Sequence, residues 1–315
     1  MTGPGRNCPL HYRYAPAVFN TAPPARLQDL EVLYVVGGLY GNDLALQSVL
    51  RLFERESGRA RLVFNGDFHW FDAEPTWFER VQREVLAFDV LRGNVETELA
   101  APEDAAGAGC GCAYPDWVGD VVVERSNRIV QRLRGAATAA QRAELAALPM
   151  WLRASVGAVQ IGIVHGDACS LAGWGFAQEH LADAAHRQQV QRWFDAAQVE
   201  AFASSHTCLP VFQRIGGAAA PRWVLNNGAA GMPNFRGDGA GLLTRFALRP
   251  FDGQQRRFGV HLRGLFIDAI AIETDAVAWQ RRFQALWPGG SDAFASYFER
   301  IVDGPAYAQG QCVRA

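Results

Sequence analysis

The stretch Leu62-Val63-Phe64-Asn65-Gly66-Asp67 is a short apolar run that ends in a glycine and a carboxylate. This pattern predicts a buried parallel strand followed by a sharp turn. In open α/β sheets, ligands bind outside the carboxyl ends of the strands. We therefore expect Asp67 to stand at the functional edge of a sheet.

Other strand-like runs end in the same way, in polar groups that suit a hard or borderline metal ion. They are Val90-Leu91-Arg92-Gly93-Asn94, Ile161-Gly162-Ile163-Val164-His165 and Ala201-Phe202-Ala203-Ser204-Ser205-His206. The sequence therefore predicts that the chain brings together Asp67, Asn94, His165 and His206.

Strands and helices alternate around the first stretch. An apolar strand over 32–36 precedes a helix capped by Asn42 and ended by Gly58, and Pro75 begins a second helix that runs to about Ala87. Strand, helix, strand, helix, strand is the order of a parallel sheet with right-handed crossovers.

Later segments are less regular. Residues 97–117 form a predicted loop that contains Cys110-Gly111-Cys112, and we expect a hairpin that turns at Gly157. We also predict helices over 118–134, 138–148, 275–286 and 291–302, loop 166–176, a helical stretch up to Ala197, and strands over 152–156, 159–164, 199–204, 209–215, 222–226, 242–249, 257–265 and 266–273.

Composition limits the class of protein. The 315 residues are 49% hydrophobic and 20% charged, with a formal net charge of -2, so the chain is globular and lacks the basic field of a general nucleic-acid binder. We find neither a membrane-spanning run nor an apolar signal core in residues 1–25, and we expect a cytoplasmic protein. The six cysteines do not resemble a disulfide framework, so we expect reduced thiols.

Residues 1–30 are irregular and rich in proline, but Cys8-Pro9-Leu10-His11-Tyr12-Arg13-Tyr14 is too aromatic for a disordered leader. We expect residues 1–30 to be an arm packed on the body, 31–250 to be the main domain, and 251–315 to extend it. An alternative is that Cys8, His11 or Arg13 reaches the active-site edge.

Five short blocks occur in a telling order: Gly38-Leu39-Tyr40-Gly41-Asn42, Gly66-Asp67, Gly93-Asn94-Val95-Glu96, His165-Gly166 and Ser205-His206-Thr207-Cys208, with the turn Asn226-Asn227-Gly228-Ala229 downstream. Over about residues 31–250 this order resembles the calcineurin-like metallophosphoesterases, especially their small bacterial phosphodiesterase branch. The resemblance implies an α/β fold: a calcineurin-like αββα sandwich of two mixed sheets flanked by helices.

The resemblance also implies a two-metal site, with departures. In that family the first block is Asp-x-His-Gly-Asn, the third has His after the Asn, and the fifth is Gly-His-Thr-His. Gly38, Tyr40 and Cys208 all fall on the first metal position, whereas the second position is completed by Asp67, Asn94, His165 and His206.

Half a site therefore remains, which suits one Mn, Fe or Zn ion. A rebuilt first position that uses Asp67, Cys208 and a donor from the N-terminal arm, with His69 or Tyr40 also recruited, is an alternative. In the simpler interpretation Cys208 is a buried thiol and Tyr40 fills the vacated volume. Cys110-x-Cys112 is too tightly spaced for a standard zinc pair.

The resulting hypothesis is a metal-dependent phosphoesterase that hydrolyses a phosphomonoester or phosphodiester with metal-bound hydroxide. The expected catalytic residues are Asp67, Asn94 and His165. The expected substrate is a small phosphorylated ligand, and a nucleotide whose base stacks on Trp70, Phe71 or Trp174 is one candidate. We expect the substrate to contact Asn42, Arg92, Asn227 and Gly228.

Val95 stands where the family has a histidine that acts as a general acid or contacts the phosphate. A general acid typically contributes 10²–10⁴-fold in rate. The alternative hypothesis is thus an inactive phosphoesterase-fold protein that serves as a ligand-binding or interaction module.

Overall fold

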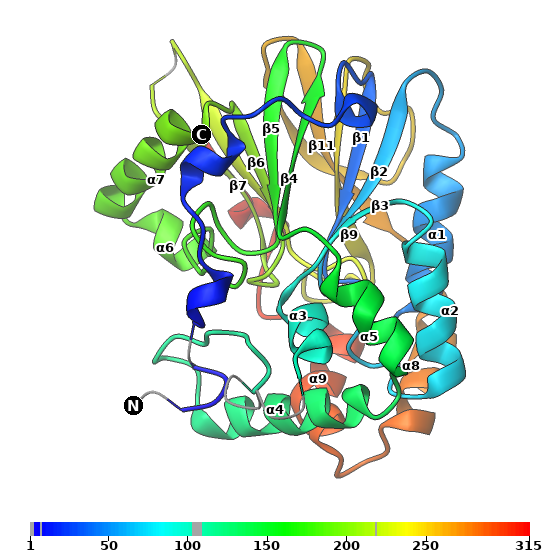
Figure 1. Ribbon diagram of the computed structural model, residues 1–315. Coiled ribbons are helices and arrows are strands. Elements are labelled where there is room, and N and C mark those ends of the chain that lie inside the picture. The colour runs from blue at the N-terminus through cyan, green and yellow to red at the C-terminus, as the bar shows by residue number, and fades with distance from the viewer. Residues whose placement is uncertain (1–2, 7, 103–108, 218) are drawn as a thin grey trace.

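Two six-stranded sheets pack face to face in the computed structural model, which describes residues 3–6, 8–102, 109–217 and 219–315. Figure 1 shows the sheets side by side at the centre of the molecule with helices on both flanks. The αββα sandwich expected from the sequence is therefore confirmed.

The first sheet has the order β10-β11-β9-β1-β2-β3. Its parallel part consists of β1, β2 and β3, and its antiparallel part of β9, β10 and β11. Their bounds are β1 Val32–Val36, β2 Ala60–Asn65, β3 Asp89–Leu91, β9 Gly241–Ala247, β10 Arg256–Leu262 and β11 Leu265–Ile272.

The second sheet has the order β12-β7-β8-β6-β5-β4, in which β5, β6 and β8 run parallel. Strands β4 and β5 form the hairpin predicted at Gly157, with Val156 opposite Val159. The bounds are β4 Trp151–Val156, β5 Val159–Val164, β6 Ala201–Ser204, β7 Pro210–Ile215, β8 Arg222–Asn227 and β12 Val313–Arg314.

Side chains alternate across each sheet because successive residues of a strand point to opposite faces. On β1, Leu33 and Val35 lie in the core between the sheets, opposite residues of the second sheet such as Ile161 and Ile163. Tyr34 and Val36 point the other way, into the core beneath the helices. Both faces of β1 are thus buried, as its continuous apolar run predicts.

Helices cover the outer faces and the lower end of the sandwich (Figure 1). The first sheet is flanked by α1 Asp43–Phe53, α2 Pro75–Val85 and α8 Ala276–Leu286, and the second by α6 Gln178–Ala182 and α7 Ala184–Ala197. Below the sheets lie α3 Asn94–Ala100, α4 Asp120–Arg134, α5 Ala139–Ala146 and α9 Asp292–Asp303. The predicted cap is present, since Asn42 Oδ1 accepts from the Ala45 amide at 3.0 Å.

Part of the predicted loop over 97–117 is helical. Residues 97–100, expected in a loop, belong to α3. The Gly93 amide donates to Glu96 Oε2 at 2.8 Å, and the Thr97 hydroxyl donates to the Gly93 carbonyl at 2.7 Å. These contacts stabilise a helix that begins directly after β3. Residues 103–108 of the predicted loop lie outside the described residues.

The N-terminal arm runs along the second sheet in three 3₁₀ turns, Leu10–Tyr12, Pro16–Phe19 and Ala25–Leu27. Phe19 is fully buried against Trp151 and Phe202. At the other end of the sequence, residues 251–315 supply β10 and β11 to one sheet and β12 to the other.

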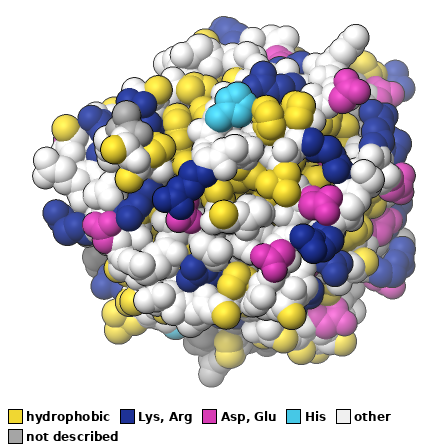
Figure 2. All heavy atoms as spheres, turned by 90° about the horizontal axis from the view of Figure 1, so that it is seen from above, with side chains coloured by type: hydrophobic (Ala, Val, Ile, Leu, Met, Phe, Trp, Pro, Cys, Tyr) yellow, Lys and Arg dark blue, Asp and Glu magenta, His cyan; other side chains and the backbone are white. Residues whose placement is uncertain are grey.

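Charged side chains of both signs are interspersed on the end of the sandwich seen in Figure 2, where neither sign gathers into one broad patch. Among the residues that the structure describes, no helix combines the length and apolar character that crossing a bilayer requires. All six cysteines are unpaired thiols, as predicted.

Candidate metal centre

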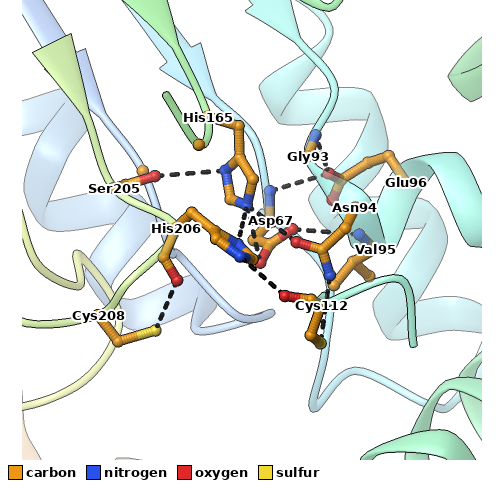
Figure 3. A network of polar contacts seen from close by, with 12 residues as sticks. Asp67, Gly93, Asn94, Val95, Glu96, Cys112, His165, Ser205, His206 and Cys208 are labelled. Atoms are coloured by element: carbon orange, nitrogen blue, oxygen red, sulfur yellow. Dashed lines mark hydrogen bonds and ion pairs between the residues drawn. The ribbon is translucent and has the colours of Figure 1, made fainter. Parts of the chain in front are cut away.

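Four polar side chains converge below the carboxyl ends of β2, β3, β5 and β6, as the strand endings predict (Figure 3). His165 Nε2 lies 3.1 Å from Asn94 Oδ1, 3.1 Å from His206 Nδ1 and 3.3 Å from Asp67 Oδ2. Asp67, His165 and His206 are all buried and offer ligand atoms close enough together to hold one metal ion.

Hydrogen bonds on the far side of these groups fix which atoms face inward. His165 Nδ1 lies 2.9 Å from the Asn65 carbonyl, and His206 Nε2 lies 3.1 Å from the Cys112 carbonyl. A carbonyl only accepts, so each of these ring nitrogens is the one that carries hydrogen. In the neutral rings His165 Nε2 and His206 Nδ1 therefore present lone pairs to each other.

Asn94 is oriented in the same manner. Its Nδ2 donates to the Cys110 carbonyl at 2.9 Å, which turns Oδ1 toward His165. The inward-facing atoms are then two imidazole lone pairs, an amide oxygen and a carboxylate. Four acceptors that face one another repel unless a cation or a proton lies between them. Imidazole, amide oxygen and carboxylate are groups that bind Zn²⁺, Fe²⁺ and Mn²⁺.

Protonation states agree with that arrangement. Burial, together with His165, lowers the pKa of His206 to about 3. Burial acts to raise the pKa of Asp67, but His165 and His206 outweigh it and the pKa is lowered. Burial acts to lower the pKa of His165, but Asp67 outweighs it and the pKa is raised, which favours a proton between these groups when no metal ion is bound. Metal binding would release that proton.

The turn that carries Asp67 is held by Glu96, a residue that the sequence did not single out. Its buried carboxylate accepts from the amides of Asp67 at 2.8 Å, Phe68 at 3.0 Å, His69 at 3.3 Å and Gly93 at 2.8 Å. Asp67 has a φ of 52°, in the left-handed region that side-chain-bearing residues rarely adopt. Glu96 thus stabilises an uncommon backbone conformation that aims Asp67 at the centre (Figure 3).

Gly66, directly before Asp67, has a φ of 92°, and a Cβ there would lie 2.5 Å from the Gly93 amide nitrogen and 2.7 Å from His165 Nδ1. Position 66 therefore requires glycine for steric reasons, because only glycine lets the turn before Asp67 approach α3 and His165 so closely.

The Cys110–Cys112 loop is buried rather than a surface loop. Its backbone carbonyls hold Asn94 and His206 in place, and the Cys112 thiol lies 3.5 Å from Asn94 Nδ2. The Tyr12 hydroxyl bonds to Glu98, and Gly111 packs on that hydroxyl, so the N-terminal arm supports this loop. Cys8 contacts Ser170 at 3.2 Å, and His11 and Arg13 are exposed; none of the three lines the cavity next to the centre.

The position of the family's first metal is filled by side chains. Tyr40 is buried, and its hydroxyl lies 2.7 Å from Cys208 Sγ. His69, the other candidate ligand, lies elsewhere: its Nδ1 is 2.6 Å from Asp72, and its ring stacks on Phe78 at 3.7 Å between centroids. This geometry agrees with Tyr40 as a filler.

The predicted substrate contacts are engaged away from the centre. Asn42 Nδ2 donates to the Gly231 carbonyl, and Arg92 donates to the Ala146 carbonyl at the end of α5. Asn227 Nδ2 donates to the Gly37 and Leu242 carbonyls, and the Gly228 amide donates to Asn226. None of the four lines the adjacent cavity, and a role for them in substrate binding stays a prediction.

Comparisons with known proteins identify the fold. No protein-family model matches the sequence, and no curated protein matches it either. Among solved structures, a metallophosphoesterase from Sphaerobacter thermophilus is similar at 16% identity and a TM-score of 0.54, with 87% of this chain and 100% of that chain covered. A hypothetical protein from Pyrococcus horikoshii OT3 is similar at 15% identity and a TM-score of 0.58, with 88% and 99% covered. The chain therefore has the calcineurin-like metallophosphoesterase fold.

Proposed function

We propose that this protein is a metal-dependent phosphodiesterase that works with a single divalent ion, held by Asp67, Asn94, His165 and His206. The observation that carries the proposal is the set of four acceptor atoms turned toward one another by outward hydrogen bonds. Such an arrangement is the usual outer-shell pattern of a metal site.

A divalent ion bound there would polarise a phosphoryl oxygen and lower the pKa of a bound water molecule. The chain's own residues supply the rest. Asn65, Cys110 and Cys112 fix the ligand orientation through their carbonyls, and Glu96 fixes the Asp67 turn. A largely apolar cavity beside Asp67 and His206 limits the access of bulk water.

Charge favours a diester over a monoester. No Lys or Arg lines this cavity, and the undescribed residues contain neither. Among the described residues that line the cavity, Asp67 is the single acid, so a divalent ion beside it leaves about one positive charge there. A diester monoanion matches that charge, whereas a monoester dianion lacks a second cation.

A second candidate function, a binding module that does not cleave its ligand, is favoured by Val95. This side chain lines the cavity where the family has a proton donor, and Tyr40 with Cys208 fills the volume of the other metal. The same phosphorylated ligand would then be held without turnover.

The test is metal content together with hydrolysis of bis(p-nitrophenyl) phosphate and p-nitrophenyl phosphate, for wild type, Asp67→Asn and His206→Gln, with Cys208→Ala as control. We expect one metal per chain in wild type and in Cys208→Ala, loss of that metal in the other two, and turnover of the diester only where the metal is kept. Metal uptake without turnover would favour the binding module. Absence of metal uptake in every supplemented sample would refute both the centre and the proposed activity.

A further inference from the structure

We propose that the organic group of the substrate is compact and apolar, an aryl or short alkyl ester, and that it binds in the cavity beside the metal centre. This inference rests on the proposed function and narrows it to one chemical class of phosphate ester.

The cavity has a volume of about 250 Å³. Asp67, Asn94 and His206 reach it from the metal centre. The remaining wall is mainly aromatic and aliphatic, and includes Trp70, Val118, Val122, Trp174, Met232 and Tyr297. A phosphate at the metal centre would therefore direct one of its ester groups against apolar side chains.

Volume limits the size of that group. A cavity of about 150 Å³ holds benzene, whereas pockets for drug-sized ligands run from about 300 to 1,000 Å³. A space of about 250 Å³ accommodates one ring with a few further atoms. This volume lies below the range for drug-sized ligands.

Polar atoms in the wall are mostly committed to the protein. Trp174 Nε1 donates to the Cys112 carbonyl at 3.0 Å, the Tyr114 hydroxyl contacts Ser126 at 3.1 Å, and Tyr40 is bonded to Cys208. These side chains offer ring faces and edges to a ligand. Such a wall has little means of reading base edges or sugar hydroxyls, but it buries an apolar ring well.

The Ser296 hydroxyl is a wall group without a partner. Ser296 belongs to the cavity lining, and its Oγ is buried and has no hydrogen-bond partner among the described residues. A donor of this kind suits an ester oxygen at the junction between the phosphate and its apolar group. It does not supply the several convergent hydrogen bonds that recognition of a sugar or base requires.

The test measures binding, separately from turnover, on the metal-loaded protein. The probes are methyl(phenyl)phosphinate and dimethylphosphinate, which are both monoanions whose two P–C bonds resist hydrolysis and which differ in one apolar group alone. We expect isothermal titration to show that the phenyl compound binds about tenfold tighter or more.

Val122 and its neighbour Val121 provide matched variants. Val122 lines the cavity, whereas Val121 is 58% exposed and does not line it. Val122→Asn should reduce the phenyl-to-methyl affinity ratio by about threefold or more, and Val121→Asn should leave that ratio unchanged.

The outcomes separate the two proposals. A phenyl preference that is reduced in Val122→Asn alone supports the apolar site, even if no diester is hydrolysed. Three results would overturn this inference. They are equal affinities for the two probes, no measurable binding of either probe to the metal-loaded protein, and a phenyl preference that both variants change equally. Those results would leave a metal-dependent phosphodiesterase standing wherever metal uptake and diester turnover are found.

Discussion

The hydroxyl of Tyr40 lies 2.7 Å from the sulfur of Cys208, and the sequence resemblance assigns both residues to the first metal position. Burial raises the pKa of the Cys208 thiol, and burial likewise raises that of the Tyr40 phenol. Two neutral, mutually bonded side chains are poor ligands, since a metal ion needs the thiolate. The pair therefore closes one position and leaves the four-residue centre as the single metal position that we propose.

Cobalt substitution tests this closure. The Co²⁺-loaded protein should bind one ion per chain and show no thiolate-to-cobalt charge-transfer band in the near ultraviolet, because Cys208 stays bonded to Tyr40. The measurement is absorption spectroscopy with metal analysis of wild type and Cys208→Ser. A band in wild type that is lost in Cys208→Ser would mean that the thiol is a ligand after all.

Glu96→Gln is expected to weaken both the fold and the metal centre. The amide group presents hydrogens to backbone amides that now donate to a carboxylate oxygen, so buried donors lose their acceptor. We expect a loss of about 2–4 kcal/mol in the free energy of unfolding, and about 10–100-fold in metal affinity.

Urea unfolding and metal titration measure the two effects of Glu96→Gln. Glu74→Gln is the control, since Glu74 also accepts backbone amides, from Thr76 and Trp77, but at an exposed helix start. An unchanged metal affinity in Glu96→Gln would show that the Asp67 turn does not need this carboxylate.

Gly111→Ala should lower metal affinity about tenfold, although Gly111 is not one of the proposed metal ligands. Gly111 has a φ of 66°, and a Cβ there would lie 2.3 Å from the Tyr12 hydroxyl oxygen, so the loop that orients Asn94 and His206 must shift. Gly119→Ala is the matched control, because a Cβ at Gly119 meets nothing within 4 Å. Equal metal affinities in both variants, measured by titration, would contradict an orienting role for the loop carbonyls.

Acid should remove stability that comes from the buried Glu56–Arg245 pair, whose Nε and Oε1 atoms are 2.6 Å apart. Burial acts to raise the pKa of Glu56, but the bonds from Arg245 outweigh it and the pKa is lowered. A lowered folded-state pKa gives stability that is present above the unfolded-state value, near 4.3, and is lost as the pH falls through the folded-state value.

Glu56→Gln should therefore cost about 1.5–3 kcal/mol at pH 7, since Arg245 loses its shortest ion pair and keeps only Asp268, at 3.9 Å, as a charged partner. Its unfolding free energy should also vary less with pH than that of wild type between pH 5 and 3. Urea unfolding at several pH values measures this. Parallel pH profiles for wild type and Glu56→Gln would count against the pair.

The four proposed ligands were readable from the sequence because each follows a strand, and the ends of neighbouring parallel strands meet at one edge. Glu96 was less visible, although it stands two residues after Asn94, since its function is to accept amides that become neighbours only after folding. The carbonyls of Cys110 and Cys112 leave no side-chain signature at all, and Cys112 meets His206 across 94 positions of sequence. The lining of the cavity beside the centre was the least readable, because its apolar wall is assembled from separate segments of the chain.

The conformation of Gly38 couples position 38 to position 40. Gly38 has a φ of 67°, and a Cβ placed there would lie 2.9 Å from a ring carbon of Tyr40. An acidic side chain at position 38 is thus excluded while the tyrosine remains, and removing the tyrosine alone leaves a void beside Cys208. Engineering a carboxylate into this position therefore needs two substitutions made together, because each of them alone is expected to destabilise the protein.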